Sequence, residues 1–175
     1  MKRNNRRKHL ASFVQQIASI TTRVAPFHEG IELRFINAAT MPAMPNPSLN
    51  QINQILEQNP FNGWTEIGIN LKKKVLEENV YRWLEEDNLQ RPVLVHVITD
   101  GRPDGPERSL EREDTLPEVI VECSKKLAEH GYEKDVVRFQ ISQIGNDPSA
   151  EMYLNNLVNN PELNLLNTLY ITAGE

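Results

Sequence analysis

The chain has one cysteine, Cys123, and only four histidines in 175 residues. A single thiol cannot close a disulfide within the chain, so a disulfide-stapled fold is excluded. Cys123 falls on the apolar face of a predicted helix, and we interpret it as a buried, reduced thiol rather than a nucleophile. The histidines, at positions 9, 28, 96 and 130, do not have metal-ligand spacing, which argues against a zinc site.

The sequence also lacks the short motifs of several enzyme classes. It contains no Gly-x-Ser-x-Gly nucleophile turn, no Gly-x-Gly-x-x-Gly fingerprint and no Walker phosphate loop. These absences give no support for a serine hydrolase or a nucleotide-binding enzyme. We therefore expect a protein without enzymatic activity.

Long apolar runs are missing too, since none reaches membrane-spanning length and no signal-peptide core follows the N-terminal residues. We expect a cytoplasmic protein with no membrane partner. The net charge is -5 and apolar residues make up 39%, a globular composition with no reason to favour nucleic acid as a partner. Five basic residues among the first eight are interpreted as solvated first turns of a helix rather than a nucleic-acid patch.

What the chain does have is an alternation of helical and strand-like hydrophobic patterns. Helices are predicted over Lys8–Val24, after Ser48, over Thr65–Glu86, from Thr115 towards Gly131 and after Asp147. Strands are predicted over Ile31–Ile36, Val93–Thr99, Val137–Ser142 and Thr168–Thr172. This order implies an α/β fold, one domain over residues 1–175, with a mostly parallel sheet sandwiched between helices.

Several local signals refine this prediction. Ser48 with Gln51, and Thr115 with Glu118, have the spacing of capping boxes. Gly131 is expected to end one helix, and Asp147 with the following proline to begin another. Prolines at 42, 45 and 47 predict no regular structure over Met41–Pro47. Polar residues alternating with Val137, Phe139 and Ile141 indicate a strand near the sheet edge.

The most informative stretch is Val93–Asp104, reading VLVHVITDGRPD. Its nearly continuous apolar run predicts a strand buried on both faces, with His96 as a hydrogen-bonded core residue. Asp100 follows at the carboxyl end of this strand, where ligands bind in parallel sheets. Thr65 is expected to bring a hydroxyl to the same rim, and the two oxygen ligands suit magnesium. Each also has a structural interpretation, Thr65 as a helix N-cap and Asp100 as part of an Asp-Gly turn.

Three segments together resemble a von Willebrand factor A (vWA) domain of the intracellular type found in fungal and other eukaryotic proteins. They are Gly63-Trp64-Thr65, Ile98–Asp104 and Ile144–Asp147. The resemblance implies a Rossmann-like sheet and a metal-ion-dependent adhesion site (MIDAS), whose cation is completed by an acidic group from a partner protein. By position, Thr65 matches the family's threonine and Asp100 its later aspartate.

The chain departs from this family at its N-terminal end. The Asp-x-Ser-x-Ser motif is absent, and so is the first, central strand that would lie between Ile31–Ile36 and Val93–Thr99. We therefore predict an N-terminally incomplete vWA-like domain, which is a fragment, the product of an incomplete gene model, or a degenerate copy of a larger protein. Its metal site is reduced to Thr65 and Asp100, with weak affinity for magnesium.

The function that follows is a protein-interaction module of the adhesion type, with a protein partner that the sequence does not identify. Two alternatives stay open. One is a magnesium-dependent α/β hydrolase or phosphotransferase in which Asp100 and Asp104 hold the metal. The other is an inactive structural remnant that binds neither metal nor partner.

Overall fold

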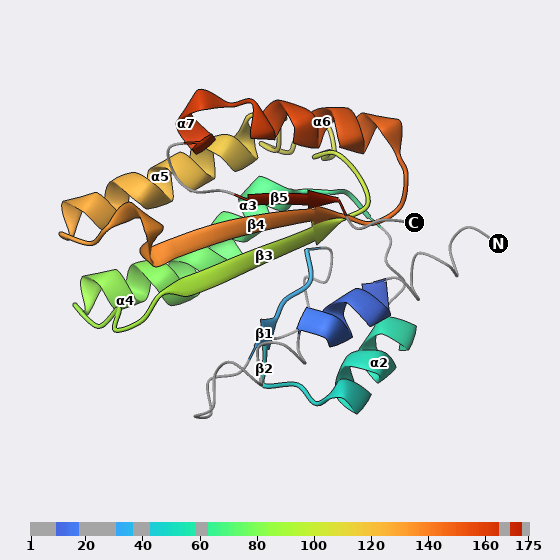
Figure 1. The fold of residues 1–175 in the computed structure, drawn as a ribbon, viewed down its shortest axis with the longest axis horizontal. Helices are drawn as coiled ribbons and strands as arrows, with labels where there is room; N and C mark the ends of the chain where they lie inside the picture. The colour runs from blue at the N-terminus through green and yellow to red at the C-terminus, as the bar shows by residue number, and fades with distance from the viewer. Residues whose placement is uncertain (1–9, 18–30, 37–42, 59–62, 165–168, 173–175) are drawn as a thin grey trace. The chain divides into compact units, whose positions relative to one another are not determined.

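The computed structural model describes residues 10–17, 31–36, 43–58, 63–164 and 169–172. The chain divides into two compact units, residues 1–63 and residues 64–175, whose elements are labelled in Figure 1. A single domain over residues 1–175 stays a prediction.

The first unit contains a small antiparallel sheet. Its strands are β1 (Glu32–Leu33) and β2 (Met44–Pro45), with Glu32 opposite Pro45. The strand predicted over Ile31–Ile36 is therefore shorter than expected, and the prediction of no regular structure around β2 was wrong. Pro45 is accommodated because an edge strand tolerates a residue without an N–H donor.

Two helical segments complete the described part of this unit. One covers residues 10–17, and the rest of the helix predicted over Lys8–Val24 lies outside the described residues. The other is α2 (Leu49–Gln58), which begins with the predicted capping box. The Ser48 N–H donates to Gln51 Oε1 at 2.8 Å, and the Gln51 N–H donates to Ser48 Oγ at 3.3 Å.

The second unit is built on a parallel sheet with the order β3-β4-β5. The strands are β3 (Val93–Thr99), β4 (Val137–Gln143) and β5 (Leu169–Thr172). Strands β3 and β4 pair in register from Val93 opposite Val137 to Thr99 opposite Gln143. The predicted α/β class and parallel sheet are confirmed at this level.

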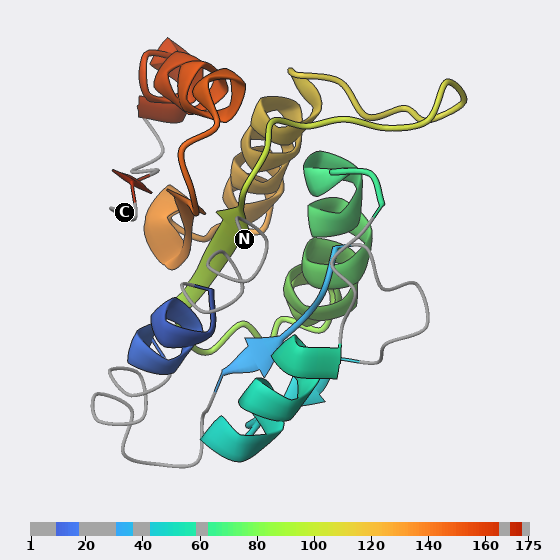
Figure 2. The same cartoon turned by 90° about the vertical axis from the view of Figure 1, so that its right-hand side faces the viewer.

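The helices of this unit lie on one side of the sheet. Helix α5 (Thr115–Glu129) connects β3 to β4, and α6 (Pro148–Val158) followed by α7 (Pro161–Asn164) leads from β4 to β5. Successive right-handed crossovers in one direction place both connecting helices on the same face. Figure 2 shows this arrangement, with the helix over residues 67–85 packed beside α5.

The helix over residues 67–85 is continuous but changes its winding. It starts as α3 (Ile67–Leu71), continues as the π-helix η1 (Lys72–Tyr81) and ends as α4 (Arg82–Glu85). An α-helix would bury Val75, four residues after the buried Leu71, whereas Leu76 is the residue that is fully buried. Hydrogen bonds of a π-helix span five residues, which moves the buried position one residue further along the chain.

Strand β4 lies in the middle of the described sheet, so the prediction that it lies near an edge was wrong. Its residues Val137, Phe139 and Ile141 are buried, while Arg138 on the opposite face is exposed. The polar alternation therefore marks the face that the helices of this unit do not cover. Leu94 of β3 is on that face and is 62% exposed, so burial of this strand on both faces was also a wrong prediction.

Of the two ends predicted for α5, the C-terminal one at Gly131 is confirmed and the N-terminal capping box is not. Helix α5 ends in a Schellman motif, in which the Tyr132 N–H donates to Leu127 O at 2.9 Å and Gly131, with φ 78°, donates to Ala128 O. The capping box predicted at Thr115 does not form. Its hydroxyl instead accepts from the Arg112 N–H at 2.8 Å and belongs to the preceding loop.

A close approach fixes the packing of α3 against α5. A β-carbon added to Gly68 would lie 2.8 Å from the backbone nitrogen of Leu116 and 2.8 Å from Thr115 Cγ2. Only glycine leaves room for these two helix starts to meet.

Candidate functional site

The candidate site lies beyond the carboxyl ends of β3 and β4. The Ile144 N–H donates to Thr99 O at 2.8 Å, which extends the pairing of the two strands to their last residues. Asp100 follows at once and is exposed. The strand thus delivers an accessible carboxylate to the rim where parallel sheets bind ligands, as the sequence predicted.

A threonine hydroxyl holds the backbone around Asp100. Thr99 Oγ1 donates to the carbonyl oxygen of Gly101 at 2.9 Å and accepts from its N–H at 3.2 Å. Thr99 itself is buried. The hydroxyl of Thr99 therefore holds the backbone of the Asp100–Gly101 turn through both polar groups of Gly101.

The structure brings Thr65 to this turn. A β-carbon built on Gly101 would lie 3.7 Å from Thr65 Oγ1, an ordinary contact distance. The hydroxyl of Thr65 and the turn that carries Asp100 are thus neighbours, although they come from distant parts of the sequence. The interpretation of Thr65 as the N-cap was wrong, because Glu66 occupies that position and makes no side-chain capping bond.

The N-terminus of α3 is capped by Glu111, a role that no pattern in the sequence indicated. Its Oε1 accepts from the Gly68 N–H at 2.9 Å, and its Oε2 accepts from the Ile69 N–H at 2.9 Å. The residue is 8% exposed, and burial raises the pKa of its carboxyl above the ordinary value. The only signal in the sequence was that α3 needed an acceptor for its first N–H groups.

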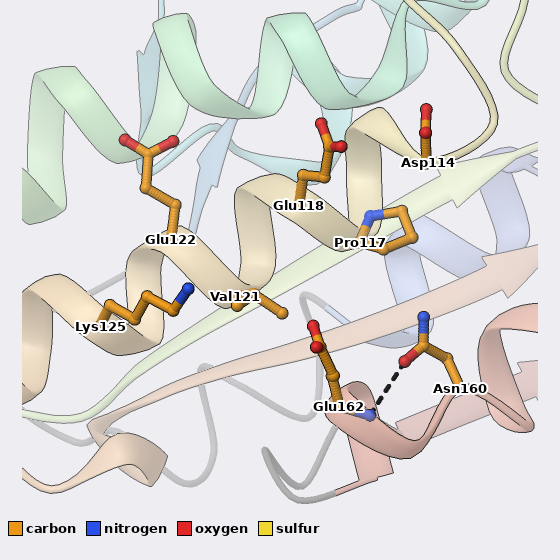
Figure 3. A pocket seen from close by; sticks show the side chains of 8 residues that line it. All are labelled: Asp114, Pro117, Glu118, Val121, Glu122, Lys125, Asn160 and Glu162. Atoms are coloured by element: carbon orange, nitrogen blue, oxygen red, sulfur yellow. Dashed lines mark hydrogen bonds between the residues drawn. The ribbon is translucent and has the colours of Figure 1, made fainter.

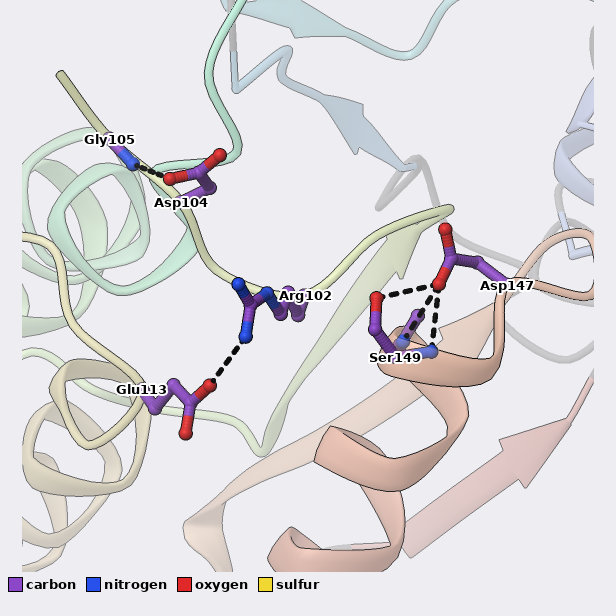
Figure 4. Close-up of polar contacts among 7 residues, drawn as sticks. Arg102, Asp104, Gly105, Glu113, Asp147 and Ser149 are labelled. Carbon is purple, nitrogen blue, oxygen red and sulfur yellow. Dashed lines mark hydrogen bonds and ion pairs between the residues drawn. The ribbon is translucent and has the colours of Figure 1, made fainter.

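Further bonds tie the loop between β3 and α5 to the start of α3. The Asp104 N–H donates to Thr65 O at 3.1 Å, and the Ser109 hydroxyl donates to the carboxylate of Glu66. On the other side of the loop, Arg102 forms an exposed ion pair with Glu113 at 3.1 Å (Figure 4). The loop is therefore held at several points around Thr65.

The contacts of Asp104 do not support a metal ion shared with Asp100. Its Oδ1 accepts from the N–H of Gly105 at 2.9 Å, so the carboxylate is engaged in its own turn (Figure 4). The enzyme alternative, which needs both aspartates on one metal, gains no support from this contact.

Asp147 ends the segment Ile144–Asp147, the third of the segments that resemble a vWA domain. It is the N-cap of α6, as predicted. Its Oδ1 accepts from the N–H and the hydroxyl of Ser149 at 2.8 and 2.6 Å and from the Ala150 N–H at 3.3 Å (Figure 4). Its carbonyl oxygen accepts from Gln143 Nε2 at 3.1 Å. The Gln143 Oε1 atom is buried without a hydrogen-bond partner in the described part of the chain.

Thr65 and Asp100 supply one hydroxyl and one carboxylate to this rim. Magnesium takes oxygen ligands and keeps several waters, so these two groups fit its chemistry but satisfy few of its positions. Among the described residues no group of three or more histidine, cysteine, aspartate or glutamate side chains is arranged to hold a metal ion.

His96 and Ser142 form a second polar pair, on the face of the sheet away from α5. His96 Nε2 and Ser142 Oγ are 2.8 Å apart, which confirms the predicted hydrogen bond, whereas the side chain is half-buried rather than in the core. Burial lowers the pKa of His96 below its ordinary value. Ser142 is 0% exposed, so this pair is not arranged to present a nucleophile to a substrate.

Cys123 has no access to solvent. It is fully buried on α5, and burial raises the pKa of its thiol to about 12. A thiol of this kind stays protonated at neutral pH, so the prediction of a buried, unreactive cysteine is confirmed.

A groove of about 430 Å³ lies between α5 and α7, apart from Thr65 and Asp100 (Figure 3). Its lining includes three carboxylates spaced four residues apart, at the N-cap of α5 and along that helix, and Glu162 of α7 on the other side of Pro117 and Val121. Its lining residues are Asp114, Pro117, Glu118, Val121, Glu122, Lys125, Asn160 and Glu162. Glu122 is paired with Lys72 at 2.7 Å, and Lys125 adds a positive charge to the lining.

No helix in the described part of the chain combines the length and apolar character needed to cross a membrane. No protein family, curated protein or solved structure matches the chain.

Proposed function

We propose that this chain is a protein-interaction module of the vWA type, in which Thr65 and Asp100 form a reduced metal-ion-dependent adhesion site. The observation that carries the proposal is the position of the Thr65 hydroxyl beside the Asp100–Gly101 turn. The resemblance assigns these two residues to one metal, and their segments are neighbours at the rim.

The architecture of residues 64–175 supports the same proposal. Its sheet is parallel, its helices lie on one side, and Asp100 follows the carboxyl end of β3. A Rossmann-like sheet, as the resemblance implies, binds its ligands at this end of the strands. The anchored loop between β3 and α5 gives the rim a fixed backbone on which a partner can dock.

The chemistry of the two side chains sets the expected affinity and the kind of partner. One carboxylate and one hydroxyl leave most magnesium positions to water, so binding of the ion alone is weak. A carboxylate from a partner protein would replace a water and add a negative charge next to the ion. The partner is therefore a protein with an accessible aspartate or glutamate.

Titration calorimetry of magnesium into the full chain tests the metal site. We expect a dissociation constant of roughly 1 mM or weaker, and loss of binding in both Asp100→Ala and Thr65→Ala. Asp104→Asn is the matched control, because its carboxylate bonds to Gly105 and should leave binding unchanged. Binding tighter than this that survives Asp100→Ala would place the metal elsewhere.

Affinity capture tests the interaction itself. The wild-type chain, Asp100→Ala and Asp104→Asn serve as baits, each with magnesium and with a chelator. A partner of the proposed kind is retained by the wild type and by Asp104→Asn with magnesium, and is lost with the chelator or Asp100→Ala. Partners that bind all baits in all conditions would contradict a metal-dependent interaction.

A further inference from the structure

The loop between β3 and α5 contains a segment whose side chains alternate between two sides. Ser109 and Glu111 are turned inward, because the Ser109 hydroxyl donates to a carboxylate at the start of α3 and Glu111, 8% exposed, caps that helix. The residues beside and between these two are exposed to water, namely Arg108, Leu110 and Arg112. We call these three residues the outward stripe.

Hydrogen bonds hold the backbone beneath the outward stripe. The Glu111 N–H donates to Ser109 Oγ at 3.0 Å. The Arg112 N–H donates to the hydroxyl of Thr115 at 2.8 Å, and the same hydroxyl donates to Leu110 O at 3.3 Å. A surface with a fixed backbone loses little conformational freedom when a partner binds to it.

The stability of the fold does not explain the three outward side chains. Leu110 is 72% exposed, more than any other large apolar side chain in the described part of the chain. Arg112 lies two residues before Asp114, the N-cap of α5, where a cation opposes the helix macrodipole. Within the described residues, neither Arg108 nor Arg112 forms an ion pair. An apolar side chain between two such arginines is suited to contact with another molecule.

The charges around the outward stripe favour a protein segment over a nucleic acid or a membrane. Glu107 and Glu113 are exposed directly beside the stripe, and the whole chain has a net charge of -5. These charges repel a polyanion, whose phosphates extend well beyond two arginines. A short segment with two carboxylates can reach the arginines without lying against the neighbouring acids.

We propose that the outward stripe is a docking surface for an extended protein segment in which an acidic residue lies on each side of an apolar one. The two carboxylates pair with Arg108 and Arg112, and the apolar side chain covers Leu110. Side chains on one side of an extended segment are two residues apart, so the partner has the spacing acid-x-apolar-x-acid. No metal takes part, and the surface acts independently of Thr65 and Asp100.

Selection of phage-displayed random peptides on the full chain, in the presence of a chelator, tests this inference. We expect the enriched peptides to carry acidic residues on both sides of an apolar one, and their binding to weaken at high salt. Leu110→Ser, and the double variant of Arg108→Gln with Arg112→Gln, should each bind these peptides about tenfold more weakly. Absence of enrichment, or enriched peptides without acidic residues, would overturn the proposal.

Matched variants control for exposed residues of the same types. Leu94→Ser and Arg138→Gln change an exposed leucine and an exposed arginine of the sheet, and both should bind the peptides like the wild type. Equal losses in these controls would contradict a surface at the outward stripe. Asp100→Ala should also bind the peptides normally, so failure of the metal site and failure of this surface give different results.

Two further measurements complete the test. In urea denaturation, Leu110→Ser and Arg112→Gln should keep the wild-type midpoint, because their side chains face water; a large fall in the midpoint would give them a structural role instead. Single-stranded DNA and phosphatidylserine vesicles serve as polyanion probes. If either binds more tightly than the peptides and is released in the double arginine variant, the partner is a polyanion and the proposal is wrong.

Discussion

Glu111 and Gly68 are joined by a 2.9 Å hydrogen bond between a buried carboxylate and the first turn of α3, across 43 residues of sequence. The N-cap residue of this helix contributes no side-chain bond. A residue of the distant loop therefore replaces the local cap that helix starts usually carry.

Glu111→Ala should destabilise the fold by about 1 to 3 kcal/mol, because it leaves the N–H groups of Gly68 and Ile69 without their acceptor in a buried place. Urea denaturation of wild type and variant gives the difference. The exposed Glu107 in the same loop provides the control, and Glu107→Ala should stay within about 0.5 kcal/mol. Equal effects of the two changes would show that the cap is not what stabilises α3.

Gly68→Ala should cost about 1 to 3 kcal/mol, since the new β-carbon would overlap backbone atoms at the start of α5. Gly101→Ala is the matched comparison. Its β-carbon would meet only Thr65 Oγ1, at 3.7 Å. In thermal unfolding, Gly68→Ala should have a clearly lower melting temperature than Gly101→Ala. An unchanged melting temperature in Gly68→Ala would mean that close packing of α3 on α5 at this contact does not stabilise the fold.

Asp147→Ala should destabilise the protein by about 0.5 to 2 kcal/mol through loss of the α6 cap. The neighbouring Asn146 is exposed and lies outside the helix, so Asn146→Ala serves as control in the same denaturation series. Asp147→Asn keeps an Oδ1 atom that can accept from the Ser149 N–H and hydroxyl. It should therefore be less destabilising than Asp147→Ala.

The half-buried His96 predicts a pH dependence with a definite sign. Its pKa in the folded state lies below the ordinary 6.5, so the unfolded chain binds the proton more readily. The stability that depends on neutral His96 is fully present above pH 6.5 and is lost as the pH falls towards the folded-state pKa. The difference in unfolding free energy between wild type and His96→Gln should therefore shrink between about pH 8 and about pH 5.

Ser142→Ala separates the two causes at this pair. It removes the hydrogen-bond partner but keeps the imidazole half-buried, so the pH dependence should persist, because partial burial is what lowers the pKa. Loss of the pH dependence in Ser142→Ala would assign it to the hydrogen bond instead.

Local signals predicted much of the fold. The caps at Ser48, Gly131 and Asp147 depend on residues within one turn, and each was found where the sequence placed it. The strand ending at Asp100 and the helix over residues 67–85 were likewise visible as apolar patterns. These features are determined by neighbours in the chain, which a single sequence displays directly.

Features set by distant residues were not predictable in this way. The central position of β4 was missed because its polar residues indicate an uncovered face as readily as an edge. The role of Glu111 depends on a loop that returns to α3, and no spacing rule signals such a contact. The resemblance led us to expect Thr65 near Gly101. It did not lead us to expect that the Thr99 hydroxyl bonds to the backbone of the turn.

The cap that Glu111 provides also has a consequence for the order of folding. We expect its carboxylate to reach α3 late in folding, because 43 residues, including β3 and the following loop, separate the two partners. Closure of so long a segment belongs to the late part of a folding reaction. The first turn of α3 should then be unformed in the transition state, so that Glu111→Ala speeds unfolding and leaves the rate of folding nearly unchanged.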